Sequence, residues 1–229
     1  MLQGKHLLRL RGTRSFGFYV AQDYNPEFKQ RLENQHMVKS DKEYRFAIVG
    51  CGPAGFYCAK QIIKNVPKVR VDIFDRNPHP FGLVRTGVAP DHPEMKKIEA
   101  DYAEVLEDKE RCNFYGNVWV GTEDGVSIEK LRSMYSGVVL AYGATSEREL
   151  GLARERELKG VLSSRQIANW YNGSLDRDSD IESQLSLGSV RELAIIGNGN
   201  VAMDITRVLL KDPSLMAPFD MPSPALKTL

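Results

Sequence analysis

The chain has 229 residues, of which 42% are hydrophobic and 27% charged, a composition typical of one or two globular domains. The formal net charge is +1, so no broad basic field predicts nucleic acid as a partner. Three cysteines without a CxxC pair argue against a disulfide scaffold, a redox disulfide and a zinc site, and we expect no metal.

The first 22 residues are basic and free of acids. Their four cations are interleaved with leucines and followed by hydroxyl residues: Lys5, Arg9, Arg11 and Arg14. This pattern is typical of a mitochondrial targeting peptide, and a disordered basic tail is the alternative. The polar stretch 23–42 then predicts a linker, so we expect residues 1–42 to be a targeting peptide and linker.

A strand, a glycine-rich turn and a helix are predicted next. The apolar run 45–50 indicates a buried strand, residues 53–66 a helix and residues 69–75 a second strand. The turn between the first two reads GCGPAG and places glycines at the three positions of a GxGxxG pattern: Gly50, Gly52 and Gly55. In this context the pattern predicts a dinucleotide site, and a glycine-rich turn that binds nothing is the alternative.

Each residue of this turn has a physical task. Gly50 permits the tight turn, Gly52 lets backbone N–H groups approach a pyrophosphate, and Gly55 lets the helix pack closely on the strand. Pro53 suits the first helical turn, whose positive end faces the phosphates. Asp75 ends the second strand, where it would accept hydrogen bonds from a ribose; its charge favours FAD or NAD over NADP.

The middle of the chain predicts further alternating elements. Residues 76–93 hold four prolines and two glycines and indicate a long ordered loop, which is usually functional. After it we expect a helix over 94–111, a hairpin or two strand fragments over 112–121, a helix over 128–134, a buried strand over 138–143 and a helix over 163–170.

A second strand–turn–helix pattern is predicted over residues 192–210. Gly197, Gly199 and Ala202 form GxGxxA, a variant often associated with NADP. The returning strand that would complete this unit is absent, because four prolines follow Lys211. The turn therefore predicts a half-built NADP site, with a strand and helix that merely pack as the alternative.

Six motifs occur in one order along the chain: GCGPAGFY (50–57), PFGLVRTGVAPDHPEMK (80–96), FYGNVWVG (114–121), VVLAYGA (138–144), WYNG (170–173) and GNGNVAMD (197–204). Together they resemble the mitochondrial NADPH–adrenodoxin (ferredoxin) reductase family, whose members are about twice as long. The resemblance implies an α/β fold. A Rossmann-like, three-layer FAD-binding domain over 43–145 precedes the start of a second Rossmann-like, NADP-binding domain over 146–229, and both are incomplete.

The resemblance also implies a function. An FAD-dependent oxidoreductase of the mitochondrial matrix would pass electrons from NADPH through the flavin to a [2Fe–2S] ferredoxin of the adrenodoxin type. A non-catalytic remnant that binds FAD, or serves as a structural subunit of a mitochondrial assembly, is the alternative. A flavin-and-NADPH module like the glutamate synthase small subunit fits less well. Peripheral contact with the inner membrane, and a partner chain covering the missing half, are further expectations.

The resemblance assigns site residues by position. It places the FAD pyrophosphate on five residues of the first turn, the ribose on Asp75, and the rest of the cofactor on residues further along: Gly50, Gly52, Pro53, Ala54 and Gly55, then Gly82, Leu83 and Arg85, then Val120, Ala141, Tyr142 and Gly143. It places the NADPH pyrophosphate on Gly197, Gly199, Asn200 and Val201. His92 is the candidate catalytic residue, either on a proton or electron path or as a hydrogen bonder that stabilises its turn.

Overall fold

A computed structural model describes residues 42–144, 147, 149–155, 157–185 and 187–229. The predicted targeting peptide and nearly all of the predicted linker lie outside these residues. Glu43–Leu229 forms one compact unit. Among the residues described, no helix is both long and apolar enough to span a bilayer, and no cluster of His, Cys, Asp or Glu side chains is arranged to hold a metal ion.

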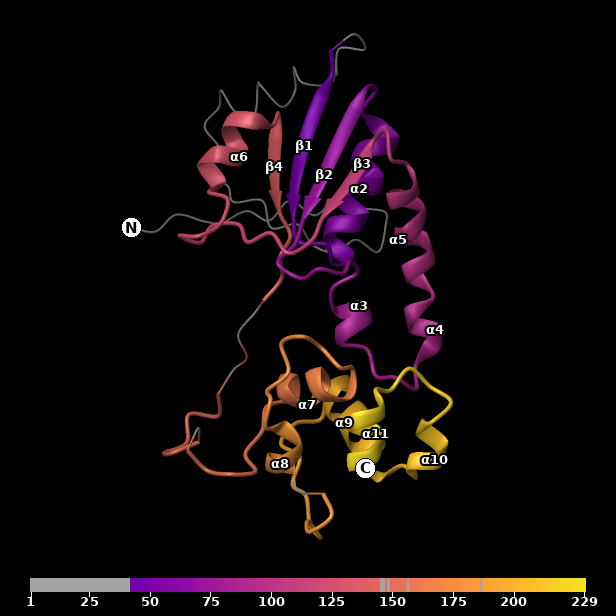
Figure 1. The fold of residues 1–229 in the computed structure, drawn as a ribbon, viewed down its shortest axis with the longest axis vertical. Helices are drawn as coiled ribbons and strands as arrows, with labels where there is room; N and C mark the ends of the chain where they lie inside the picture. Colours follow the sequence, from indigo (N-terminus) through magenta and orange to yellow (C-terminus); the bar gives the residue numbers. More distant parts are fainter. Residues whose placement is uncertain (1–41, 145–146, 148, 156, 186) are drawn as a thin grey trace, which may run out of the picture. The chain divides into compact units, whose positions relative to one another are not determined.

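A parallel sheet of four strands organises the first part of this unit. The strands are β1 (Tyr44–Val49), β2 (Val69–Phe74), β3 (Cys112–Tyr115) and β4 (Gly137–Leu140), in the order β3-β2-β1-β4. All three pairings are parallel, so the carboxyl ends of the strands gather at one edge of the sheet (Figure 1). In open α/β sheets this edge is where ligands bind.

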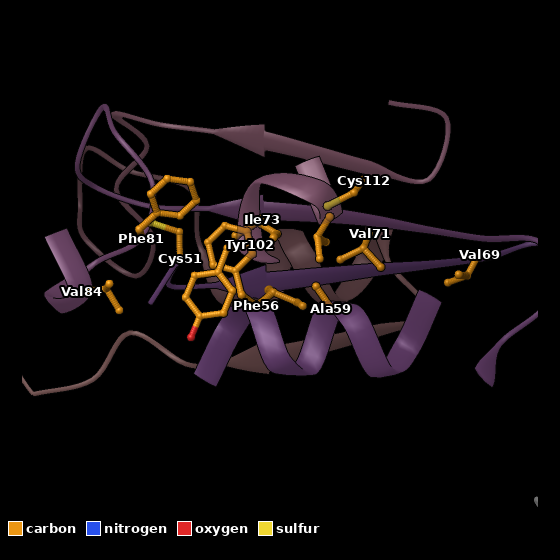
Figure 2. Packing of buried hydrophobic residues seen from close by; sticks show 12 residues of the cluster. Cys51, Phe56, Ala59, Val69, Val71, Ile73, Phe81, Val84, Tyr102 and Cys112 are labelled. Carbon is orange, nitrogen blue, oxygen red and sulfur yellow. The ribbon is translucent and has the colours of Figure 1, made fainter. Parts of the chain in front are cut away.

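Both faces of the sheet are covered, which makes the predicted three layers. Helices α2 (Pro53–Asn65) and α5 (Ile98–Glu107) pack over one face around Ile48, Val71 and Ile73. On that face the rings of Phe56 and Tyr102 stack with centroids 4.8 Å apart (Figure 2). Helix α6 (Ile128–Met134) and the preceding segment cover the alternate strand residues of the other face, which include Ala47, Val49 and Phe74.

The helices after β4 form a second apolar cluster. They are α7 (Ser164–Tyr171), α8 (Ile181–Leu185), α9 (Asn200–Leu210), α10 (Pro213–Met216) and α11 (Ser223–Thr228). Trp170 and Tyr171 are fully buried in this cluster together with Val208 and Met216. Helix α7 begins at a capping box, in which the Ser163 hydroxyl accepts from the Gln166 N–H and the Gln166 side chain accepts from the Ser163 N–H.

Most of the predicted elements are present with small changes at their ends. The long loop contains one short helix, α3 (Leu83–Thr86), and the helix predicted over 94–111 is divided into α4 (Pro93–Lys96) and α5. Of the two alternatives expected for 112–121, the hairpin is wrong, and strand fragments form instead: β3, and an isolated bridge between Val120 and Val126. Residues 112–115 instead pair in parallel with Val71–Phe74, and the chain then crosses back, where the Val118 N–H donates to the Asp75 carbonyl oxygen at 2.9 Å.

The strand predicted at the start of the second strand–turn–helix is also wrong. Residues 192–196 are irregular, and Leu193 and Ile196 are 53% and 74% exposed. A strand needs a neighbour to pair its backbone groups, and the described part of the chain provides none for this segment. The helix that follows does form, because its apolar face is buried at Ile205 and Val208.

Candidate functional site

The first glycine turn lies where β1 passes into α2. The Gly50 N–H donates to the Phe74 carbonyl oxygen at 2.7 Å, which ties the turn to β2. Gly50 has φ +108°, and a Cβ on it would lie 2.4 Å from the Ala141 carbonyl oxygen. A Cβ on Gly55 would lie 2.1 Å from the Gly50 carbonyl oxygen. Both positions therefore require glycine for the fold itself, as the sequence predicts.

Gly52 is different, because a Cβ built on it would meet nothing within 4 Å. It is the N-cap of α2, no side chain caps the helix there, and Pro53 occupies its first turn. The unpaired N–H groups and the positive end of the helix dipole thus remain available next to a backbone that lacks a side chain. This arrangement suits an anionic group such as a pyrophosphate.

Asp75 directly follows β2 and lies beside this turn. Its Oδ2 accepts from the Cys51 N–H at 2.8 Å and its Oδ1 accepts from the Asn77 N–H at 2.8 Å. The carboxylate thus holds the glycine turn in shape, a task that the sequence did not reveal. Each oxygen keeps a further lone pair with which it can accept a hydroxyl hydrogen bond.

The long loop begins against the same turn. The Phe81 N–H donates to the Cys51 carbonyl oxygen at 3.1 Å, and Gly82 has φ +50° with its would-be Cβ 2.9 Å from the Gly52 Cα. Leu83 follows with 61% of its surface exposed. The Arg85 guanidinium lies over the Phe81 ring at 4.9 Å from the centroid and pairs with Glu99 at 3.4 Å. These two contacts hold the Arg85 side chain in place without a ligand.

The segment after β4 forms the other neighbour of the turn. The Ala141 N–H donates to the Val49 carbonyl oxygen at 2.7 Å, while Tyr142 is 62% exposed and Gly143 has φ +68°. The structure thus brings Ala141 against Gly50, with Tyr142 and Gly143 next along the chain. Val120 packs with the residues around α6 on one face of the sheet, and no contact described for it reaches the glycine turn.

The second glycine turn has the expected local conformation. Gly197 has φ +131°, and Gly199 is the N-cap of α9 with open space where a Cβ would lie. Asn200 and Val201 are the first two residues of that helix, and Val201 is 48% exposed. The second turn resembles the first where it enters its helix. It differs on the other side, because residues 192–196 before it are irregular, whereas β1 precedes the first turn.

His92 lies in a charged cluster that the sequence did not predict. Its Nδ1 is 2.7 Å from Glu94 Oε1 and its Nε2 is 3.4 Å from Asp204 Oδ1. Next to it, the Asp91 carboxylate is 2% exposed and accepts from Arg207 Nε at 2.7 Å, Arg207 Nη2 at 2.8 Å and Lys211 Nζ at 3.0 Å. The APDHP motif was the signal that could have found Asp91.

Electrostatics follow from these contacts. The hydrogen bonds from Arg207 and Lys211 hold the pKa of Asp91 well below its usual range, against the opposing effect of burial. Asp91 also raises the pKa of Arg207, which stays protonated in any case. Within the glycine turn, burial and the Asp75 charge raise the pKa of the Cys51 thiol to about 12, so this cysteine is not a nucleophile at neutral pH.

A second buried carboxylate lies on the sheet away from the glycine turn. Asp72 on β2 is 2% exposed and accepts from three side chains: Tyr135 at 2.8 Å, Asn113 at 3.0 Å and Arg45 at 3.2 Å. Two of these partners lie on strands of the sheet, Arg45 on β1 and Asn113 on β3, and Tyr135 directly follows α6. We therefore assign Asp72 to the fold and not to the site.

Comparison with protein families identifies this arrangement. The family described as pyridine nucleotide-disulphide oxidoreductase matches residues 44–212. The chain belongs to this family. Among curated members, it is 44% identical over 182 residues to the probable mitochondrial NADPH:adrenodoxin oxidoreductase of Schizosaccharomyces pombe, an alignment covering 80% of this chain and 37% of that protein. It is 42% identical to the mitochondrial NADPH:adrenodoxin oxidoreductase of Homo sapiens, over 85% of this chain and 38% of that protein.

Solved structures are also similar to this chain. The atomic-resolution structure of FprA, a Mycobacterium tuberculosis oxidoreductase in which a covalent modification of NADP+ was found, superposes with a TM-score of 0.73 at 36% identity. The alignment covers 82% of this chain and 41% of FprA, and the complex of FprA with NADPH matches equally well. The resemblance drawn from the motifs is thus confirmed. This chain spans less than half the length of these relatives.

Proposed function

We propose that this family member binds FAD at the first glycine turn. Gly50, Gly52, Pro53, Ala54 and Gly55 cradle the pyrophosphate, and Asp75 holds the adenosine ribose with the lone pairs left free by Cys51 and Asn77. Gly82, Leu83 and Arg85 line the flavin part of the cofactor. Val120 and the segment Ala141–Gly143 contact its remaining length.

The observation that carries this proposal is the open space at Gly52. The turn is tightly packed at Gly50 and Gly55, yet nothing lies within 4 Å of a Cβ built on Gly52, which is the N-cap of α2. A turn that served only the fold would gain from a side chain at this position, since glycine is entropically costly. Open space beside a helix N-terminus and a carboxylate fits a dinucleotide with a free ribose.

We further propose that the chain is the FAD-binding part, with the start of the NADPH-binding part, of an oxidoreductase. NADPH is the electron donor, and its pyrophosphate meets Gly197, Gly199, Asn200 and Val201. When bound, a flavin accepts a hydride and releases single electrons, which suits a [2Fe–2S] ferredoxin as acceptor. The names of the relatives support this proposal and favour the enzyme over a non-catalytic remnant.

Domain limits and location are part of the same proposal. Residues 1–42 form a targeting peptide and linker, 43–145 the FAD-binding domain and 146–229 the partial NADP-binding domain. The mitochondrion is the location, since the relatives are named mitochondrial, and the matrix is its compartment. Contact with the inner membrane and a partner chain against the second domain stay predictions.

The test is flavin binding by the purified chain. We expect a flavin absorption band that stays with the protein through gel filtration at near-stoichiometric FAD. Gly52→Ala should leave the fold intact and weaken FAD binding about tenfold or more, because the methyl group occupies the space that the pyrophosphate needs. Gly188→Ala is the matched control: Gly188 is also exposed to open space, but far along the chain from the turn.

Two results would contradict the proposal. A wild-type chain without retained flavin argues against FAD binding, and equal FAD affinity of the two glycine variants argues against this site. With FAD bound, NADPH-dependent reduction of an adrenodoxin-type ferredoxin then tests the electron path. A loaded chain that does not oxidise NADPH leaves the FAD site intact and contradicts the proposed NADPH site.

A further inference from the structure

The loop from Phe81 to His92 is fixed to the first glycine turn at its start. The Phe81 N–H donates to the Cys51 carbonyl oxygen, and the backbone of Gly82 lies against the backbone of Gly52. Gly82 adopts φ +50°, a conformation that a residue with a side chain rarely takes. The loop therefore follows any change in the position of the turn.

The same loop is fixed to helix α9 at its end. Ala89 and Pro90 are fully buried, and Ala89 belongs to the apolar cluster of the C-terminal helices. Asp91 then makes three charge-assisted hydrogen bonds, two to the Arg207 guanidinium and one to Lys211. The fork of Arg207 meets the carboxylate with two bonds, which fixes orientation as well as distance.

Between these ends the loop is internally bonded. The Arg85 and Thr86 N–H groups donate to the Gly82 carbonyl oxygen, the Gly87 N–H donates to the Leu83 oxygen, and the His92 N–H donates to the Ala89 oxygen. The Asn172 side chain adds an N–H bond to the Thr86 carbonyl oxygen at 3.1 Å. These bonds connect the two fixed ends of the loop through its own backbone.

Arg207 in turn connects to the second glycine turn. It lies on α9, whose first residues Asn200 and Val201 follow directly from Gly199. Its Nη2 also donates to Asp204 at 2.9 Å, and Asp204 faces His92. One continuous set of contacts therefore runs from Gly52 through Gly82 and Asp91 to the helix that opens the second turn.

We propose that the loop 81–92 couples the two glycine turns, with Asp91 as the positioning residue: a dinucleotide that orders the first turn also orders α9 and the second turn. The inference rests on the proposed function, because it needs FAD at the first turn. It assigns no chemistry to Asp91, which is buried beneath Arg207 and Lys211 and is held by them. Coupling of this kind is reciprocal, so order at the second turn would also favour FAD at the first.

Hydrogen exchange measures the coupling directly. In the wild-type chain, saturating FAD should slow amide exchange of residues 200–210 about fivefold or more. Asp91→Asn removes the charge that holds Arg207 but leaves the first glycine turn unaltered. FAD should therefore still bind at the first turn, while the FAD-dependent slowing of amide exchange over residues 200–210 disappears. Arg207→Lys keeps the charge without the fork and should lose most of the slowing as well.

Asp220→Asn is the matched control. Lys96 pairs with Asp220 at 3.1 Å, so this variant also breaks an ion pair between the region of the loop and the C-terminal helices, but the Asp220 side chain is 83% exposed. It should keep the full FAD-dependent slowing. A merely structural role of Asp91 would speed exchange in the free and FAD-bound protein alike and would leave their ratio unchanged.

The outcomes separate the two proposals. Bound flavin with unchanged exchange over 200–210 in the wild type overturns the coupling and leaves the proposed function standing. The same holds if Asp91→Asn and Arg207→Lys both keep the wild-type ratio of exchange rates. A wild-type chain that retains no flavin overturns the proposed function, and the coupling falls with it.

Discussion

Gly55 lies so close to Gly50 that a Cβ on Gly55 would be 2.1 Å from the Gly50 carbonyl oxygen. That Cβ would also be 3.4 Å from the Ile48 side chain. Helix α2 can therefore approach β1 only because position 55 has no side chain. The third glycine of the motif is a packing residue, while Gly52 lies in open space and is the residue that we propose faces the cofactor.

This relationship predicts a loss of stability on substitution of Gly55 and almost none on substitution of Gly52. Gly55→Ala should lower the free energy of unfolding by about 1–3 kcal/mol, since a methyl group forces the helix and strand apart. Gly52→Ala should change it by less than about 0.5 kcal/mol. Urea unfolding followed by circular dichroism measures both, in the absence of FAD. Equal losses for the two variants would contradict the packing role of Gly55.

The Asp72 cluster predicts an effect of alkaline pH. Burial and the Asp72 carboxylate raise the pKa of Tyr135 above its usual range, so the protonated hydroxyl is stabilised in the folded state. Tyr135→Phe should cost about 1–3 kcal/mol near neutral pH, because the buried Asp72 loses one of its donors.

The pH dependence has a definite sign. A raised folded-state pKa means that the stabilisation is present below the unfolded value of about 10 and is lost as the pH rises. Wild-type stability should therefore fall toward that of Tyr135→Phe in alkaline buffer, as measured by urea unfolding across pH. Tyr115→Phe is the control, since that ring is 44% exposed. An unchanged gap between wild type and Tyr135→Phe at high pH would refute the assignment.

Asp91 predicts the opposite sign at acidic pH. Its pKa is lowered by Arg207 and Lys211, so its contribution is present above the unfolded value of about 3.9 and is lost as the pH falls. Asp91→Asn should lower the free energy of unfolding by about 3 kcal/mol near neutral pH. The reason is that the partly buried Arg207 charge then lacks the carboxylate charge that balances it. In thermal melts from neutral to acidic pH, the melting temperatures of wild type and Asp91→Asn should converge in acid. The melting temperature of Asp220→Asn should stay close to that of wild type throughout.

We expect the first 42 residues to direct import into mitochondria and to contribute nothing to the stability of the unit that begins at Glu43. A fusion of residues 1–42 to a fluorescent protein should enter mitochondria, because its first 22 residues are basic and free of acids, as in a targeting peptide. Replacing Arg9, Arg11 and Arg14 by glutamate should abolish import. A chain that begins at Glu43, where the compact unit starts, should melt within about 1 °C of the full chain. Cytosolic fluorescence of the unaltered fusion would rule out the targeting prediction.

Local patterns predicted much of the fold. The β1–α2–β2 unit, α6 and α7 lie within a residue or two of their predicted limits, because each has an apolar period and a clear end signal. The same rules left residues 112–121 open between a hairpin and two strand fragments, and they wrongly predicted a strand over 192–196. In the first case the partner of the strand is β2, which is distant along the chain, and in the second the described residues contain no partner.

By itself the sequence determined the glycine turn, its acidic neighbour and the family, since all of these depend on residue types at short, regular spacing. Only the tertiary structure decided that Asp75 also holds the turn, that Asp72 collects three donors and that Asp91 meets Arg207. Asp91 and Arg207 are 116 positions apart in the chain. Their pairing depends on how the loop 81–92 is buried against α9, and no periodicity or short motif encodes the meeting of two charges across that distance.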